Sequence, residues 1–285
     1  MPDLWIDLLE CLALERASPG SNGEATQAAV FEGRNQQLEY HRLFGGQLLG
    51  QLIQAARLTC PGKAVKSLHT VFAREGRADE PVTYEAIRHH EGRSFATLTV
   101  TGRQQPSTAD AGSEERTRVL ATSSICMHVV EDGPEHQEVD EVPPVLGAEH
   151  RLALDLIPWE TRAVDDLSAT GTGPPQFEFW MRTPDVDPAL APALAAYATD
   201  LTLIGTALRP MDGLGQSGNG TQFTSAVTTH TLWFHRPFRT DEWLLLRQHS
   251  PLLAHGRCFG RGDVLTERGI LVASYSQEAL LRVAT

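Results

Sequence analysis

Residues 188–208 read PALAPALAAYATDLTLIGTAL, and this stretch decides how we expect the chain to fold. Its large apolar side chains recur at steps of three and four residues, which predicts one continuous helix. They are Leu194, Tyr197, Leu201, Ile204 and Leu208. The opposite face carries alanine and threonine, so the helix is apolar on all sides. Because the stretch contains Pro192 and Asp200, a buried helix of a soluble protein explains it better than a membrane span.

Asp200 is the exception within this helix. Its neighbours one turn away are Ala196, Tyr197, Leu203 and Ile204. A carboxylate among such side chains loses solvation, so it needs hydrogen-bond partners or has a raised pKa. Buried carboxylates of this kind occur at functional sites, and they also occur in structural roles in which nearby amides bond them. The helix alone leaves both interpretations of Asp200 open.

Composition limits the class of protein. The chain has 285 residues, 41% apolar and 21% charged, which is enough for one large domain or two ordinary ones. A net charge of −12 argues against a general nucleic-acid binder and against attachment to anionic lipid. We expect no bilayer-spanning run and no signal peptide, since the first residues lack a basic start and a small-residue cleavage site.

The cysteines indicate the compartment and exclude one kind of metal site. Cys11, Cys60, Cys126 and Cys258 are far apart, and no CxxC or CxxH pair exists. A structural zinc site is therefore not expected. Scattered single cysteines fit a reducing compartment, so we expect a cytoplasmic protein.

Four pairs of similar short sequence segments recur in the same order and indicate an internal duplication. They are FGGQLLGQLIQAA (from Phe44) with YATDLTLIGTAL (from Tyr197), HTVFAR (69–74) with HTLWFHR (230–236), GRSF (92–95) with GRCF (256–259), and LATSSI (120–125) with VASYSQ (272–277). The first pair aligns Gln47 with Asp200, and the last aligns Ile125 with Gln277. Only the second copy therefore offers a carboxylate and an amide, which predicts one site per chain.

The repeat also predicts the architecture, which is α+β. In each copy a long apolar helix precedes several antiparallel strands, so we expect a curved sheet wrapped around that helix. The two sheets should join into one continuous sheet. The predicted parts are an N-terminal helix and lead-in over 1–30, a first repeat over 31–130, a linker over 131–170, and a second repeat with the site over 171–285.

Taken together, the words FGGQLLGQ, SLHTVFAREG, GRSF, YATDLTLIG, LWFHRPF and LVASYSQE resemble the acyl-CoA thioesterase II family. The resemblance covers about residues 4–280. It implies a double hotdog fold and hydrolysis of fatty acyl-CoA thioesters to free acid and CoA, within fatty acid metabolism. It also implies no cofactor, no metal and no covalent intermediate, and it suggests a homo-oligomer.

The family places an Asp, a Ser or Thr and a Gln around the attacking water. The resemblance carries the Asp to Asp200 and the Gln to Gln277. The hydroxyl position falls on Val227, which is a departure, since the family reads [Ser/Thr]-x-Asp-His where this chain reads VTTH (227–230). Side chains alternate along a strand, so we expect Thr229 to share the face of Val227 and to offer a hydroxyl displaced by about 6–7 Å.

Three functions follow from this pattern. The first is a thioesterase whose activity is weakened by Val227, with backbone N–H groups at a helix start, such as Gly45 and Gly46, stabilising the oxyanion. The second is an acyl-CoA-binding protein with a decayed hydrolytic site. The third is a hydratase or dehydratase, which ranks last because no His follows Asp200 closely. For the same reason His230 is expected to pack and to hydrogen-bond, since no carboxylate neighbours it in the sequence.

Overall fold

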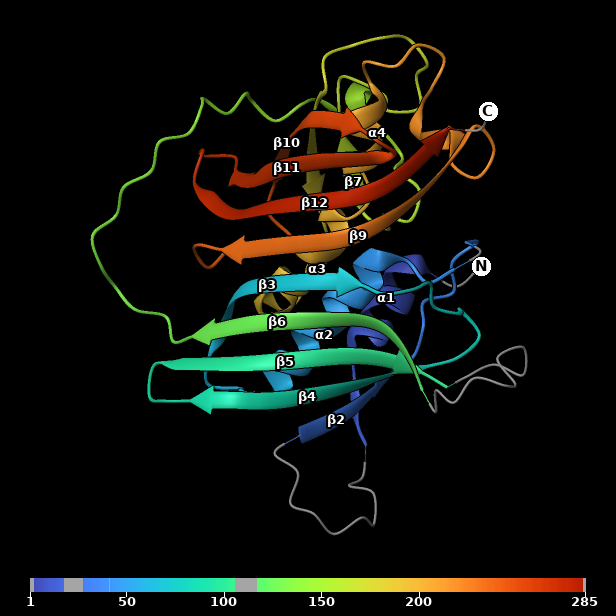
Figure 1. Cartoon of the computed structure of the whole chain (residues 1–285). Coiled ribbons are helices and arrows are strands. Elements are labelled where there is room, and N and C mark those ends of the chain that lie inside the picture. The colour runs from blue at the N-terminus through green and yellow to red at the C-terminus, as the bar shows by residue number, and fades with distance from the viewer. Residues whose placement is uncertain (1–2, 18–27, 41, 106–116, 284–285) are drawn as a thin grey trace. The chain divides into compact units, whose positions relative to one another are not determined.

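The computed structural model describes residues 3–17, 28–40, 42–105 and 117–283. The chain divides into two compact units, unit 1 over Met1–Asp132 and unit 2 over Gly133–Thr285 (Figure 1). Part of the predicted lead-in, residues 18–27, lies outside the described residues. The joining of the two sheets into one continuous sheet stays a prediction, and each unit is described by itself below.

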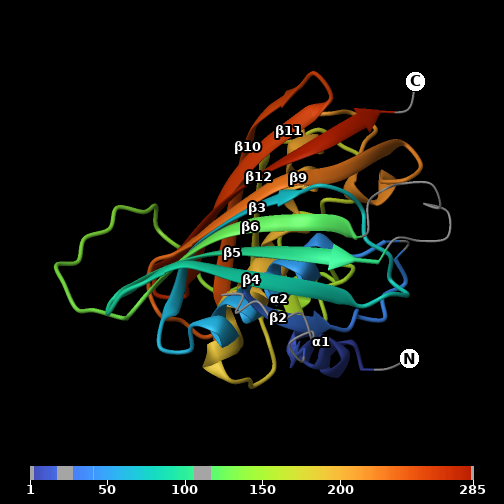
Figure 2. The ribbon, with the colours of Figure 1, turned by 60° about the horizontal axis from the view of Figure 1, so that its bottom comes forward.

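Unit 1 is an antiparallel sheet with two helices. Its elements are α1 (Leu4–Leu12), β1 (Glu15–Arg16), β2 (Ala28–Gly33), α2 (Gly45–Thr59), β3 (Ala64–Phe72), β4 (Val82–Glu91), β5 (Phe95–Gln104) and β6 (Arg118–His128). The strand order within the unit is β1-β2-β4-β5-β6-β3. Helix α2 packs against β3, β4 and β5, and Figure 2 shows it lying along one face of this sheet.

The burial of α2 explains its sequence. Every residue from Gly46 to Ala56 is buried, so this position suits a helix without charged residues in that stretch, and its polar side chains Gln47, Gln51 and Gln54 are buried as well. Strands β2 to β6 all contact α2, and helix α1 packs on it as well, which confirms the expected hotdog arrangement of a sheet curved around a buried helix.

Unit 2 repeats this plan with additional short elements. They are η2 (Ala148–His150), β7 (Glu160–Arg162), β8 (Gln176–Arg182), η3 (Pro188–Leu190), α3 (Ala191–Thr199), α4 (Leu203–Leu208), η4 (Gln216–Gly218), β9 (Phe223–Phe234), β10 (Leu244–Ala254), β11 (Arg257–Thr266) and β12 (Leu271–Val283). The strand order within the unit is β9-β12-β11-β10-β8-β7.

The predicted linker also takes part in the fold of unit 2. Strand β7 pairs with β8 at the edge of the sheet. Four aliphatic side chains of the linker pack against the apolar cluster of Trp180, Leu245 and Leu265. They are Val139, Val142, Val145 and Leu146.

The stretch over 188–208 is not one continuous helix, which corrects the expectation from its periodicity. It forms η3, α3 and α4, with an interruption from Asp200 to Thr202. Before the interruption the Thr199 hydroxyl competes for the Ala196 carbonyl at 3.0 Å. After it, the Thr206 hydroxyl shares the Thr202 carbonyl with the Thr206 N–H, each at 2.9 Å. Periodicity does not register this competition.

The same stretch also meets the length and hydropathy of a bilayer span. An 18-residue window within Pro188–Leu208 has a mean hydropathy of 1.2, contrary to the expectation that no run would be long enough. In the structure 72% of it is buried inside the protein, which is how the core helix of a soluble protein satisfies the same criterion.

Candidate active site

The interruption of the helix places Asp200 at the junction of two helices in unit 2. Asp200 is the C-cap residue of α3, and α4 begins three residues later. Its side chain is buried, with 5% of the residue exposed. The sequence-based expectation of a buried carboxylate is therefore met, and Asp200 lies where the helix is interrupted.

A β-bulge in strand β9 decides which of its side chains share the site. Along β9 and β12, Ala279 faces Val227, Glu278 faces Thr229 and Gln277 faces His230. Three steps on β9 thus correspond to two on β12, and Thr228 is the extra residue. Ala279 lies in the apolar cluster formed with α4, so its partner Val227 is on the helix side, as is His230.

Thr229 does not share that side, which corrects the alternation expected from the sequence. It is the neighbour of the inward-facing His230 and lies opposite Glu278, so its side chain points to the other face of the sheet. Thr228 Oγ1 donates to the Glu278 carbonyl at 3.0 Å. Ser225, another hydroxyl residue of β9, donates to Asn219 Oδ1 at 3.1 Å. The bulge therefore puts His230 on the helix side, opposite Gln277, and leaves Thr229 out.

His230 joins Asp200 to Gln277. Its Nδ1 lies 2.9 Å from Gln277 Oε1 and 3.8 Å from Asp200 Oδ1, and its Nε2 lies 3.1 Å from Thr199 Oγ1. The carboxylate and the amide are therefore neighbours across one ring nitrogen. The sequence missed this contact because 30 positions separate Asp200 from His230, and only the fold brings them together.

Burial determines the charge of His230. The ring is fully buried, and this desolvation lowers the pKa of His230 from its ordinary 6.5 to about 4, against the opposing hydrogen bond to Gln277. At neutral pH the imidazole is uncharged, so the 3.8 Å approach to Asp200 is not an ion pair. From the sequence alone, a hydratase ranks last because no His follows Asp200 closely. In the folded protein His230 lies beside Asp200, so that reason no longer applies.

The Gln277 amide has an unused donor. The residue is 2% exposed, and its Nε2 has no hydrogen-bond partner within the described part of the chain. A buried amide nitrogen without a partner loses about 1–3 kcal/mol relative to a bonded one, so an oxygen from outside the protein is expected to occupy its place. The site therefore offers a carboxylate that accepts and an amide that donates, which suits one water molecule or a polar substrate atom.

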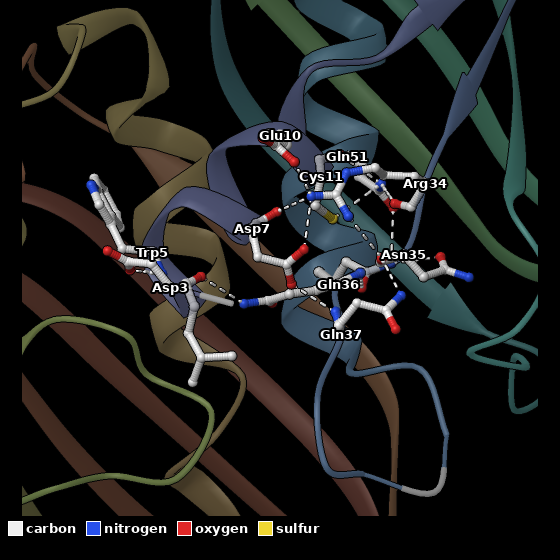
Figure 3. Close-up of polar contacts among 12 residues, drawn as sticks. Asp3, Trp5, Asp7, Glu10, Cys11, Arg34, Asn35, Gln36, Gln37 and Gln51 are labelled. Carbon is white, nitrogen blue, oxygen red and sulfur yellow. Dashed lines mark hydrogen bonds and ion pairs between the residues drawn. The ribbon is translucent and has the colours of Figure 1, made fainter. Parts of the chain in front are cut away.

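At the equivalent position of unit 1, protein atoms occupy the hydrogen-bonding groups of the side chain. Gln47, the sequence counterpart of Asp200, accepts from the Gln36 N–H at 3.0 Å and donates to Asn35 Oδ1 at 2.9 Å. Next to it, Gln51 Nε2 donates at 2.9 Å to the carbonyls of Cys11 and Arg34 (Figure 3). Protein atoms thus satisfy both amides, and nothing in this network calls for an external ligand.

The strand pair of unit 1 carries apolar residues where unit 2 carries His230 and Gln277. A bulge at Lys66 gives β3 the same register as β9, and it places Leu68 opposite Ile125. Leu68 is therefore the structural counterpart of His230. This corrects the word match that aligned His69 with His230, since His69 is exposed on the other face.

Metal ligation and cysteine chemistry find little support. Among residues that the structure describes, no group of three or more His, Cys, Asp or Glu side chains is arranged to hold a metal ion. Burial raises the pKa of the Cys11 thiol to about 12 and that of Cys258 to about 11, so both thiols stay protonated and unreactive.

Two family models match this chain. The acyl-CoA thioesterase N-terminal domain matches residues 36–125, and the acyl-CoA thioesterase C-terminal domain matches residues 129–281. Human acyl-coenzyme A thioesterase 8 is 28% identical over 92% of this chain and 87% of its own length. Acyl-CoA thioesterase 2 of Haemophilus influenzae is 27% identical over 99% of each chain. The crystal structure of acyl-CoA thioesterase II TesB2 from Mycobacterium marinum gives a TM-score of 0.73 at 29% identity, covering 98% of this chain and 99% of that one.

Proposed function

The chain belongs to the acyl-CoA thioesterase family, and we propose that it hydrolyses fatty acyl-CoA thioesters at Asp200 and Gln277. One observation supports this placement above the others. A buried carboxylate and a buried amide with an unused N–H group meet at one ring nitrogen of His230. That combination provides both an acceptor and a donor for a water molecule next to an acyl carbonyl.

In the proposed reaction Asp200 is the general base. Its carboxylate takes one proton from the bound water while the water oxygen attacks the thioester carbon, which contributes roughly 10²–10⁴-fold to the rate. The tetrahedral intermediate then breaks its carbon–sulfur bond. The CoA sulfur leaves with the proton that Asp200 received, and the acyl group leaves as the free acid. Neither a metal nor a covalent enzyme intermediate takes part in these steps.

Gln277 is the donor in this scheme. An amide cannot accept the proton of the water at neutral pH, so it does not replace Asp200. Its Nε2 donates instead to the water oxygen or to the carbonyl oxygen on which negative charge develops. Such a bond strengthens as that oxygen becomes anionic, and it therefore favours the transition state.

Val227 weakens the site in this proposal. It stands on the helix side of β9, where the family pattern has a hydroxyl, and the bulge turns Thr229 away. The loss of one orienting hydrogen bond is expected to cost about 1–3 kcal/mol, which corresponds to slower turnover by about 5–150-fold. Hydrolysis should therefore be slow but measurable.

An acyl-CoA-binding protein with a decayed site is the second candidate, and Val227 is the observation that favours it. The two functions separate when CoA release and acyl-CoA affinity are measured on the same preparation over several chain lengths. A hydrolase releases CoA at a rate proportional to enzyme concentration. A binding protein retains affinity for acyl-CoA and releases no CoA above the uncatalysed rate.

The decisive experiment substitutes Asp200→Asn, which keeps the shape of the side chain and removes the base. We expect kcat for CoA release to fall by about 100-fold or more, with KM nearly unchanged. Asp212→Asn, at an exposed position in the same unit, is the matched control and should keep full activity. Unchanged turnover in the Asp200→Asn variant would exclude Asp200 from the mechanism.

We also propose a homo-oligomer in the cytoplasm. The four cysteines are free, as is usual in a reducing compartment, and the edges of hotdog sheets are commonly covered by association. Light scattering coupled to size exclusion measures the assembly directly. A monomer at all concentrations would contradict the oligomer without affecting the proposed reaction.

A further inference from the structure

We propose that His230 is a positioning residue for this reaction, which rests on the function proposed above. Its Nδ1–H group binds the oxygen of the Gln277 amide, so that both N–H groups of that amide are directed to the substrate and Asp200 remains the proton acceptor. His230 itself neither touches the substrate nor exchanges a proton. It determines which end of Gln277 the substrate meets.

The hydrogen-bond chemistry supports this orientation. In the observed arrangement Gln277 Oε1 lies 2.9 Å from Nδ1, and an amide oxygen only accepts, so Nδ1 carries the hydrogen. The Nε2 atom is then unprotonated, and the Thr199 hydroxyl at 3.1 Å is placed to donate to it. In the reversed orientation Gln277 would donate to Nδ1, and its oxygen would be the group left open to the substrate.

The carboxylate of Asp200 selects between these two arrangements. Its Oδ1 lies 3.8 Å from Nδ1. With hydrogen on Nδ1 the positive end of the N–H dipole is close to this oxygen, whereas without it a nitrogen lone pair is close to a carboxylate oxygen. The Nδ1–H tautomer is therefore favoured, and the amide orientation follows from it.

The ring is held firmly enough to perform this task. His230 is fully buried and stacks on Tyr275 with ring centroids 6.1 Å apart and planes inclined by 9°. A buried, uncharged imidazole has one N–H to donate, and here Nδ1 directs it to Gln277. Solvent does not compete for that bond.

The other half of the chain provides independent support. At the equivalent positions of the bulged strand pair, unit 1 has Leu68 and Ile125. The His and the Gln are thus both present or both replaced by aliphatic residues. A His that served only to pack would not need to change together with its partner.

A double-mutant cycle tests the proposal with the residues of unit 1. We expect His230→Leu and Gln277→Ile each to lower kcat by about 10–100-fold, with KM within about twofold of wild type. The double variant should be no slower than the slower single variant, because without Gln277 there is nothing to orient. His230→Asn, whose side-chain amide can donate at the same place, should recover most of the loss. Losses that multiply in the double variant, or equal losses for the Leu and Asn variants, would overturn the proposal.

A spectroscopic measurement covers the cases of poor folding and of an inactive wild type. Imidazole ¹⁵N shifts of the wild-type chain should report a neutral His230 with hydrogen on Nδ1 between pH 6 and 8, and Gln277→Ile should change the Nδ1 shift. A cation or an Nε2–H tautomer would overturn the positioning role. If wild type releases no CoA while the Nδ1–H tautomer is observed, the hydrolase proposal fails and the His230–Gln277 assignment stands.

Discussion

At the scale of single residues, burial decides which groups carry charge. Asp200 and His230 lie 3.8 Å apart, a separation at which two exposed groups of this kind form an ion pair. Complete burial lowers the pKa of His230 to about 4, so the imidazole remains neutral and places no positive charge beside Asp200. The reaction needs this distribution, because a cation beside Asp200 would weaken it as a base.

The lowered pKa of His230 predicts a pH dependence of stability. Between pH 6.5 and about pH 4, His230 is protonated in the unfolded chain and stays unprotonated in the folded chain. Stability is thus fully present above pH 6.5 and decreases as the pH falls to 4, by on the order of 3 kcal/mol. Urea unfolding from pH 4 to 8 should show wild type losing stability relative to His230→Asn over this window. Parallel curves would contradict the shift.

The position of Val227 predicts a gain of activity. Val227→Thr is nearly isosteric and puts a hydroxyl on the helix side of β9, so we expect kcat to rise by about 5-fold or more. Thr229→Val changes the opposite face and should leave kcat unaltered. Both variants are compared by CoA release at saturating substrate. A loss of activity in Thr229→Val with no gain in Val227→Thr would show that the bulge does not set the face as described.

At the scale of elements, a β-bulge determines more of the site than any helix does. One extra residue in β9 shifts the alternation, so Val227 and His230 point to the same side although three positions separate them. The same bulge occurs in β3 at Lys66. A shared irregularity is stronger support for duplication than the similar sequence segments. One of those segments, aligned at His69 and His230, was out of register by a single residue.

The buried amides of α2 predict a difference between two glutamines of one helix. Gln51→Leu leaves the Tyr84 hydroxyl and the carbonyls of Cys11 and Arg34 without their partner, and should destabilise the protein by about 2–4 kcal/mol. Gln54→Leu is the matched control, since it breaks one bond to Arg57 and should cost about 1 kcal/mol or less. Thermal unfolding measures both. Equal losses would show that the network around Gln51 adds nothing beyond burial.

At the scale of the whole molecule, the two copies of the repeat differ at the candidate site. Unit 1 fills the position of Asp200 with Gln47, whose amide is satisfied by protein atoms, and replaces the His–Gln pair with Leu68 and Ile125. Unit 2 keeps a carboxylate and an amide with an unused donor. A double hotdog chain of this kind should therefore have half as many active sites as hotdog repeats.

This asymmetry predicts a stoichiometry. Titration with a non-hydrolysable thioether analogue of an acyl-CoA should give one binding site per chain, and Asp200→Asn should lower hydrolysis by about 100-fold or more rather than by half. A chelator should leave the rate unchanged, since no metal takes part in the proposed steps. Two sites per chain, or half the activity remaining in the variant, would contradict a single site.

The sequence by itself determined the repeat, the two buried helices, and the choice of Asp200 and Gln277 as the polar residues of the second copy. These features depend on short-range patterns of residue type, such as apolar periodicity along a helix. Such patterns can be recognised in the sequence without knowledge of the fold. The tertiary structure alone decided that the helix breaks at Asp200, that His230 lies beside it, and that Thr229 faces away. The last two depend on strand register between positions far apart in the chain, for which no single stretch carries a signal. The break accompanies local hydroxyl bonds to the backbone, which apolar periodicity does not report.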